Sequence, residues 1–186
     1  MFRKFIGLFA LLLACSLFVL GQANEFDPNT LSDGGRTAYL TLKKVRLYAI
    51  GGVGYGGVTS EGEKALEVLI EEKNAKAAFL NLVREGTLEG GLYGLFGLRM
   101  LDCECFSDAR KHYESIRFLQ NDAEGVNMAS GCFYFDAKSK EEKALLLSSI
   151  LNKGFDQQAK LKECSRQTKG RPGDFGKCFR EVSKNQ

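Results

Sequence analysis

The stretch Thr59–Leu101, TSEGEKALEVLIEEKNAKAAFLNLVREGTLEGGLYGLFGLRML, holds the clearest fold information in this chain. Ser60 followed by Glu63 is a capping-box pattern, in which the hydroxyl satisfies a free helix N–H group and the carboxylate reaches back to the cap residue. Apolar residues follow at helical spacing, and Glu63 falls on the opposite, charged side. The sequence therefore predicts a helix that begins at Ser60 and keeps Glu63 in water.

Two further helices are predicted in the same stretch. One spans residues 75–85 and repeats the apolar stripe, and Gly86 is placed to end it in a left-handed conformation. The next is capped by Thr87, runs to about Leu101, and has glycines at spacings of four and three residues, namely Gly90, Gly94 and Gly97. Such glycines cost stability in an isolated helix, so close approach of a neighbouring helix is their expected compensation. We expect this helix to form the buried centre of the domain.

Two more helices are signalled further along the chain. Ser107 can cap a helix that reaches about Gln120. Ser139 with Glu142 forms a second capping box, and Gly154 is placed to close the helix that follows.

The remaining segments are less regular. Residues 156–169 and 174–182 are expected to be short helices, whereas residues 125–136 are expected to be an extended loop or short strand. Residues 39–50 fit a strand or a helix, and residues 24–36 resemble a loop.

Residues 1–23 have the pattern of a signal peptide. Arg3 and Lys4 form a positive start, Phe5–Leu20 is an almost unbroken apolar run, and small residues up to Ala23 offer a cleavage site. The apolar run is shorter than a comfortable membrane span of about 20 residues. We therefore expect an exported protein, periplasmic or secreted, with no transmembrane span in the mature chain.

An alternative reading of the leader involves Cys15. Leu12–Cys15 resembles the bacterial lipobox, in which the cysteine is lipidated and becomes the first mature residue. The mature chain would then start with the apolar run Ser16–Leu20, which fits better as part of a signal peptide. Release is favoured over a lipid anchor at Cys15.

Composition indicates one globular domain over residues 24–186. Hydrophobic residues make up 44% of the chain and charged residues 26%, which is ordinary for a folded domain and excludes a disordered one. With the helices above, the expected fold class is mainly all-α: a compact, disulfide-stabilised bundle of about six to seven short helices.

Positive charge is concentrated near the C-terminus. From Lys138 onward there are twelve Lys or Arg against six Asp or Glu, although the whole chain is only +3. A basic patch for an anionic envelope component, lipid headgroups or an acidic protein is one interpretation, and a solvated helix surface is the other. Nucleic acid is disfavoured by export and by the lack of interleaved aromatic residues. The candidate patch comprises Lys160, Lys162, Arg166, Lys169 and Arg171.

Five cysteines follow the leader, and export makes disulfides the expected state. Cys164 and Cys178 flank a turn with Gly and Pro, so we predict that they form a bridge. Cys103 and Cys105 are too close to favour each other, and one of them, preferably Cys105, is expected to pair with Cys132. Cys103 would remain as a free thiol, which could be buried, reactive, or the link in a covalent homodimer.

Metal and cofactor sites are not expected. Cys103, Cys105, His112 and Cys132 are ligand types that zinc prefers, but their spacing matches none of the common zinc motifs. The run Gly52-Val53-Gly54-Tyr55-Gly56-Gly57 matches the dinucleotide fingerprint, yet the chain lacks the succession of βαβ units that the fingerprint requires. These glycines are better interpreted as a connector with positive-φ positions.

The helices of Glu61–Leu101 resemble HEAT-type helical hairpins in spacing and apolar pattern, without a clear second copy of the repeat. The run Gly94–Arg99, after the helix start at Thr59–Glu63, is also similar to exported bacterial proteins that have no assigned activity. A HEAT-like architecture implies a protein-binding scaffold.

We therefore expect an exported helical scaffold or binding protein that acts through protein or cell-envelope contacts and not by catalysis. The alternative is a small exported hydrolase with its site between the glycine-rich loop and the third helix. His112 is the only histidine, and no nucleophile-elbow pattern accompanies it.

Overall fold

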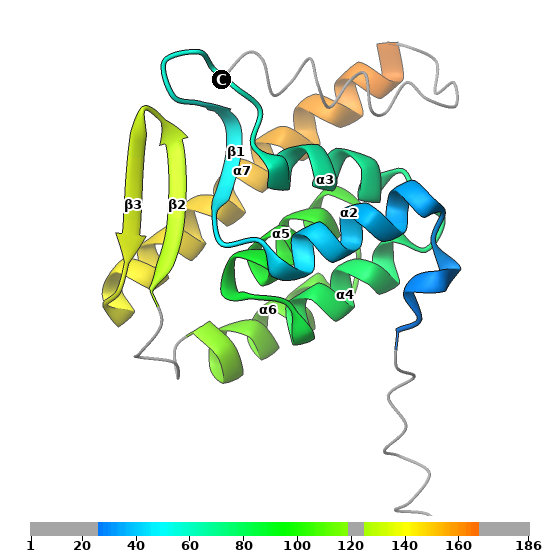
Figure 1. Ribbon diagram of the computed structural model, residues 1–186, viewed down its shortest axis with the longest axis horizontal. Helices are drawn as coiled ribbons and strands as arrows, with labels where there is room; N and C mark the ends of the chain where they lie inside the picture. The colour runs from blue at the N-terminus through cyan, green and yellow to red at the C-terminus, as the bar shows by residue number, and fades with distance from the viewer. Residues whose placement is uncertain (1–25, 119–124, 168–186) are drawn as a thin grey trace, which may run out of the picture.

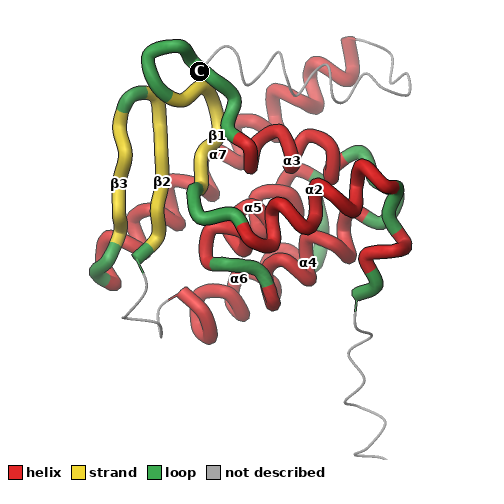
Figure 2. The backbone as a smooth tube through the Cα atoms, viewed as in Figure 1, coloured by secondary structure: helices red, strands yellow, loops and turns green. Residues whose placement is uncertain are grey.

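The computed structural model describes residues 26–118 and 125–167 of the 186-residue chain. Helices dominate, and a small sheet lies at one side of them (Figures 1 and 2). In chain order the elements are the 3-10 turn η2 (Pro28–Thr30), α2 (Asp33–Lys44), β1 (Tyr48–Val53), α3 (Glu61–Ile70), α4 (Ala75–Glu85), α5 (Leu88–Met100), α6 (Phe106–His112), the π-helical turn η3 (Tyr113–Phe118), β2 (Val126–Gly131), β3 (Phe133–Ala137) and α7 (Lys140–Gln167).

The three helices predicted from the central stretch are confirmed. Ser60 caps α3 by accepting a hydrogen bond from the N–H of Glu63 at 3.0 Å, and Thr87 caps α5 by accepting from the N–H of Gly90 at 3.0 Å. Helix α4 has the predicted bounds. The left-handed conformation predicted for Gly86 is wrong, because this residue has φ −72° and ψ 177°. The chain therefore leaves α4 in an extended conformation and enters the cap of α5 directly.

Helix α5 is the buried centre of the fold, as its glycines predict. Leu92, Leu95 and Leu98 are fully buried. A Cβ atom on Gly94 would lie 2.8 Å from the carbonyl oxygen of Phe79, so the backbones of α4 and α5 approach each other as closely as this glycine permits. The cost of glycine in a helix is thus offset by burial against α4.

A three-stranded sheet corrects the expectation of a mainly all-α fold: helices do predominate, but the strands are integral. The strand order is β1-β2-β3, with β1 parallel to β2 and β2 antiparallel to β3. Residues 125–136 were expected to be extended and form most of the β2–β3 hairpin. Residues 39–50 contain both predicted alternatives, since α2 ends at Lys44 and β1 begins at Tyr48.

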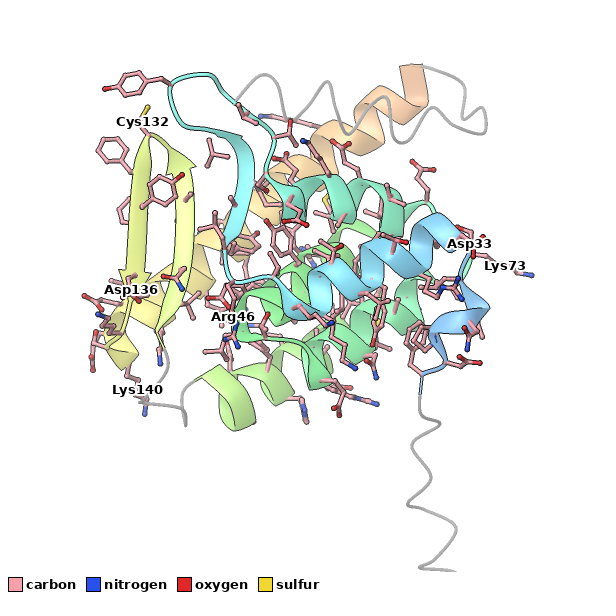
Figure 3. The ribbon with its side chains drawn as sticks, viewed as in Figure 1. Asp33, Arg46, Lys73, Cys132, Asp136 and Lys140 are labelled. Atoms are coloured by element: carbon pink, nitrogen blue, oxygen red, sulfur yellow. A yellow bond between two sulfur atoms is a disulfide. The ribbon has the colours of Figure 1, made fainter. Side chains whose placement is uncertain are left out.

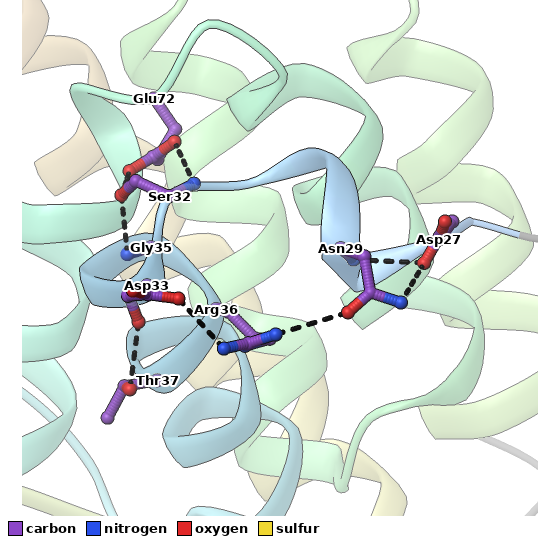
Figure 4. A network of polar contacts seen from close by, with 8 residues as sticks. All are labelled: Asp27, Asn29, Ser32, Asp33, Gly35, Arg36, Thr37 and Glu72. Atoms are coloured by element: carbon purple, nitrogen blue, oxygen red, sulfur yellow. Dashed lines mark hydrogen bonds and ion pairs between the residues drawn. The ribbon is translucent and has the colours of Figure 1, made fainter.

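The start of α2 corrects the loop predicted over residues 24–36. Ser32 caps this helix by accepting from the N–H of Gly35 at 3.1 Å, and its own N–H donates to Glu72 after α3 at 3.1 Å (Figure 4). Arg36 joins Asp33 at 2.8 Å and Asn29 at 3.2 Å in the same network. Polar contacts with residues distant in sequence thus stabilise a helix start that the local pattern did not reveal.

Two further helix boundaries differ from the prediction. Helix α6 begins at Phe106 with Cys105 as its N-cap residue, so Ser107 does not cap it. Helix α7 continues through Gly154, which is buried, and a Cβ atom there would lie 3.3 Å from Cγ of Arg99 in α5. Gly154 therefore serves the packing of α7 on α5 and does not end a helix.

Several predicted segments lie outside the described residues: the leader 1–23 with Cys15, and the helix at 174–182. Within the ranges that are described, no helix combines the length and apolar composition needed to cross a membrane.

Candidate functional site

The region between the glycine-rich loop and α5, where the hydrolase alternative placed its site, contains a buried polar network. The hydroxyl of Tyr93 donates to the carbonyl of Ala49 in β1 at 2.8 Å and accepts from the Ala49 N–H at 2.9 Å. Ser60 Oγ also donates to the Ala49 carbonyl at 2.9 Å. Burial raises the pKa of Tyr93 from its ordinary value of 10.0 to about 12, which disfavours the charged phenolate in this site.

Two buried carboxylates extend this network along the sheet. Glu63, only 1% exposed, accepts from the N–H of Gly51 in β1 at 3.1 Å, and Glu89, 2% exposed, accepts from the N–H of Asn127 in β2 at 3.0 Å. The prediction that Glu63 faces water is wrong, because its carboxylate is turned inward to a strand. Each acid provides an acceptor for a strand N–H group, so the pair fastens β1 to α3 and β2 to α5.

The bonds of this buried network indicate a structural role. The hydroxyl of Tyr93 and one carboxylate oxygen of Glu63 bond to backbone groups of β1, and both side chains lie in the core. A hydrolytic site would need an acid or nucleophile that a substrate can reach. The network's position and bonds therefore favour a role in holding the sheet.

An open groove of about 730 Å³ lies on the other side of this region, between α2 and the start of α3. Lys44 and Arg46 line one part of it, and Glu61 lines another, together with the hydroxyls of Thr37 and Thr41. Both charge signs occur along the groove, so it has no clear preference for one kind of ionic ligand.

The most distinctive surface is on the β2–β3 hairpin. Phe133, Tyr134 and Phe135 are 69%, 69% and 50% exposed, and Leu145 of α7 is 73% exposed. We call these four residues the aromatic edge. Cys132 lies at the hairpin tip, whereas Asp136 and Lys140 lie at the opposite end (Figure 3). Large apolar side chains gathered in water in this way mark interaction surfaces.

A shallow groove accompanies the aromatic edge. It has a volume of about 520 Å³ and is formed by the hairpin and the first turns of α7. Met128, Phe135 and Ala137 line it from the strands, and Leu145 and Leu146 line it from the helix. The groove thus extends the apolar surface from β3 onto α7. The sequence pointed to an extended segment here, but not to its exposed aromatic side chains.

The glycine-rich loop lies beside the hairpin tip. Gly51, Gly54 and Gly57 have φ values of 91°, 70° and 58°, which confirms the positive-φ connector. The N–H of Gly54 donates to the carbonyl of Gly131 at 2.8 Å, so the loop is joined to the tip and presents the fully exposed Tyr55 next to it.

The predicted cysteine pairing is wrong in part. Cys103 and Cys105 form a disulfide with each other, with a Cα–Cα distance of 5.1 Å, and Cys132 is a free, exposed cysteine. The turn between α5 and α6, where Asp102 has φ 51°, brings the two sulfur atoms together despite their short separation. The bridge predicted between Cys105 and Cys132 is therefore absent, and Cys103 is not the free thiol. Cys178 lies outside the described residues, and so does the side chain of Cys164, a residue of α7.

Other predicted ligand-binding residues are scattered. Among the described residues, no group of three or more His, Cys, Asp and Glu side chains is arranged to hold a metal ion. Lys160 is exposed on α7. The side chains of Lys162 and Arg166, and all of Lys169 and Arg171, fall outside the described part of the chain, so the basic patch stays a prediction.

Comparison with protein-family models, curated proteins and solved structures found no match to this chain.

Proposed function

We propose that this is an exported, non-enzymatic binding protein that acts through contacts with another polypeptide, and that the aromatic edge is its contact surface. The exposure of Phe133, Tyr134 and Phe135 on β3, and of Leu145 on the adjoining α7, is the observation that carries the proposal. Aromatic side chains are enriched at protein interfaces, because they bury a large area and lose little side-chain entropy.

The helical part of the molecule supports this proposal as a scaffold. Helices α3, α4 and α5 bury their apolar faces against one another, and Glu89 with Tyr93 fastens the sheet to α5. The hairpin is thereby presented from a rigid base, which lowers the entropy cost of binding.

The HEAT-like spacing of Glu61–Leu101 belongs to the same proposal. Export rests on the leader, and a lipid anchor at Cys15 would keep the surface at a membrane.

Photo-crosslinking in the producing cells tests the contact surface. A benzophenone amino acid is placed at Tyr134 and, in a matched control, at Leu40, which is 44% exposed on α2. We expect Tyr134 to give a protein adduct, including an adduct with a second copy of the chain, and Leu40 to give none. Equal yields at both positions, or no adduct from Tyr134, would contradict the proposal.

A further inference from the structure

Strand β3 is the outer strand of the sheet and pairs with β2 on one side only among the described elements. The hairpin closes at the Ser130–Phe133 pair through a two-residue turn in which Gly131 has φ 57°. In such a turn the N–H of the fourth residue, Phe133, bonds back to the first. Because bonding alternates along an antiparallel ladder, the backbone groups of Tyr134 and Asp136 are directed to the open edge.

We propose that a second copy of this chain pairs with β3 in antiparallel orientation, about a two-fold axis beside Phe135, and forms a six-stranded sheet across the dimer. The inference rests on the proposed function and names the partner of the aromatic edge. An exposed strand edge is a template for pairing with another chain, and a two-fold axis makes the same patch serve both partners.

The register follows from the length of the strand. Phe135 is the midpoint of Phe133–Ala137, so an axis beside it overlaps all five residues of both strands. Tyr134 then lies opposite Asp136 of the second copy, and these are the residues whose backbone groups face the edge. A shift of the axis to Asp136 would place two carboxylates opposite each other, and a shift to Tyr134 would leave the strand end unpaired.

Side chains fit the same register. Phe135 meets Phe135 of the second copy at a non-hydrogen-bonded pair, where side chains approach most closely. Phe133 lies opposite the small Ala137, and the phenol of Tyr134 can donate to the carboxylate of Asp136. The added strand would also cover the open side of the groove that Phe135 and Leu145 line. No two like charges face each other across the axis.

Cys132 distinguishes this dimer from a covalent one. In the proposed register Cys132 lies opposite Lys138 of the second copy, so the two Cys132 thiols lie at opposite ends of the paired strands. A disulfide between them would require tip-to-tip contact of the hairpins. The proposed dimer is therefore non-covalent and persists in reductant. Since five-residue strands with one flanking groove bury less than a standard interface, we expect a reversible dimer of micromolar affinity.

A charge-swap experiment tests the register. Sedimentation velocity of the full chain, with reductant and over a range of concentrations, should show a monomer–dimer equilibrium. Phe135→Lys and Phe135→Glu should each sediment as monomers, because each places two like charges opposite each other. An equimolar mixture of the two variants should restore the dimer, since position 135 faces itself only in this register.

The remaining outcomes decide against the inference. A wild-type monomer at all concentrations, a dimer that disappears with reductant, or no dimer in the mixture of variants would overturn it. A second pair of variants tests the strand pairing without changing Phe135. Tyr134→Pro removes an N–H group that faces the open edge, whereas Tyr134→Ala keeps it. Only the proline variant should abolish dimerisation, and circular dichroism checks that both variants fold. A photo-adduct from Tyr134 to a different protein, together with a monomeric wild type, would refute the dimer and leave the proposed function standing.

Discussion

The hydroxyl of Tyr93 links β1 to α5 through two hydrogen bonds with the backbone of Ala49. Tyr93→Phe removes this hydroxyl, so the buried N–H group and the carbonyl group of Ala49 each lose a hydrogen-bond partner. We expect the free energy of unfolding to fall by about 1–3 kcal/mol, measured by urea denaturation. Unchanged stability would show that these bonds contribute nothing in the folded state.

The same residue predicts a dependence of stability on pH. The pKa of Tyr93 is raised by burial from 10.0 to about 12. The unfolded chain loses this proton near pH 10, whereas the folded protein keeps it, so stability is complete below pH 10 and falls as pH rises from about 10 to 12. Burial also raises the pKa of Tyr48, so Tyr93→Phe should make the loss shallower without removing it. Tyr55→Phe, at an exposed tyrosine, is the matched control for loss of a hydroxyl.

Cysteine connectivity can be read from a tryptic map made without reductant. Cleavage after Arg99 and Arg110 gives one peptide that contains both Cys103 and Cys105 and no other cysteine. We expect this peptide to gain two hydrogens on reduction, and Cys132 to be alkylated without reduction. A peptide cross-linked between Cys105 and Cys132 would restore the pairing that the sequence predicted.

At the scale of the element, close packing of α4 against α5 depends on Gly94. A Cβ atom there would lie 2.8 Å from the Phe79 carbonyl oxygen and 2.9 Å from Cγ2 of Val83. Gly94→Ala should therefore lower the free energy of unfolding by about 1–3 kcal/mol. Gly34→Ala is the control, because a Cβ atom at this exposed position of α2 would make only ordinary van der Waals contacts, the nearest at 3.9 Å; the substitution should be neutral or stabilising by up to about 1 kcal/mol. Similar costs at both positions would refute the packing argument.

Two of the serines predicted to cap helices, Ser107 and Ser139, give a second matched pair. Ser139 accepts from the N–H of Glu142 at 3.1 Å, and Glu142 accepts in return from the N–H of Ser139 at 2.9 Å. Ser139→Ala should cost about 1 kcal/mol of unfolding free energy. Ser107→Ala should cost clearly less, because the N-cap residue of α6 is Cys105 and Ser107 lies inside the helix. Equal losses in chemical denaturation would mean that Ser107 caps a helix after all.

For the whole molecule, α5 is the element around which the others are arranged. It packs against α2, α3, α4 and α7, whereas β3, within the part of the chain that the structure describes, has its main contacts with β2 and α7. Hydrogen exchange should therefore be slowest in α5 and much faster in β3, measured by mass spectrometry at low protein concentration, where the proposed strand pairing is dissociated. Exchange of α5 at the rate of β3 would contradict this hierarchy.

Particular residues show which features local sequence determines and which depend on tertiary contacts. Ser60, Thr87 and Ser139 were predicted as caps because a cap is decided by residues within one turn. Ser107 and Gly154 carry the same local signals, but α6 starts at Phe106, before Ser107 could cap it, and α7 continues past a glycine that is packed against α5. A glycine that permits close packing and a glycine that ends a helix look alike in sequence.

The sequence by itself determined the central helices, the buried role of α5 and the positive-φ connector, since periodicity, caps and glycine spacing are local properties. Only the tertiary structure decided that Glu63 and Glu89 are turned inward to strand N–H groups, that Cys103 pairs with Cys105, and that three aromatic residues of β3 remain in water. The physical reason is that the burial of a carboxylate or an aromatic ring depends on which distant backbone and side-chain groups lie beside it, and chain topology sets that arrangement.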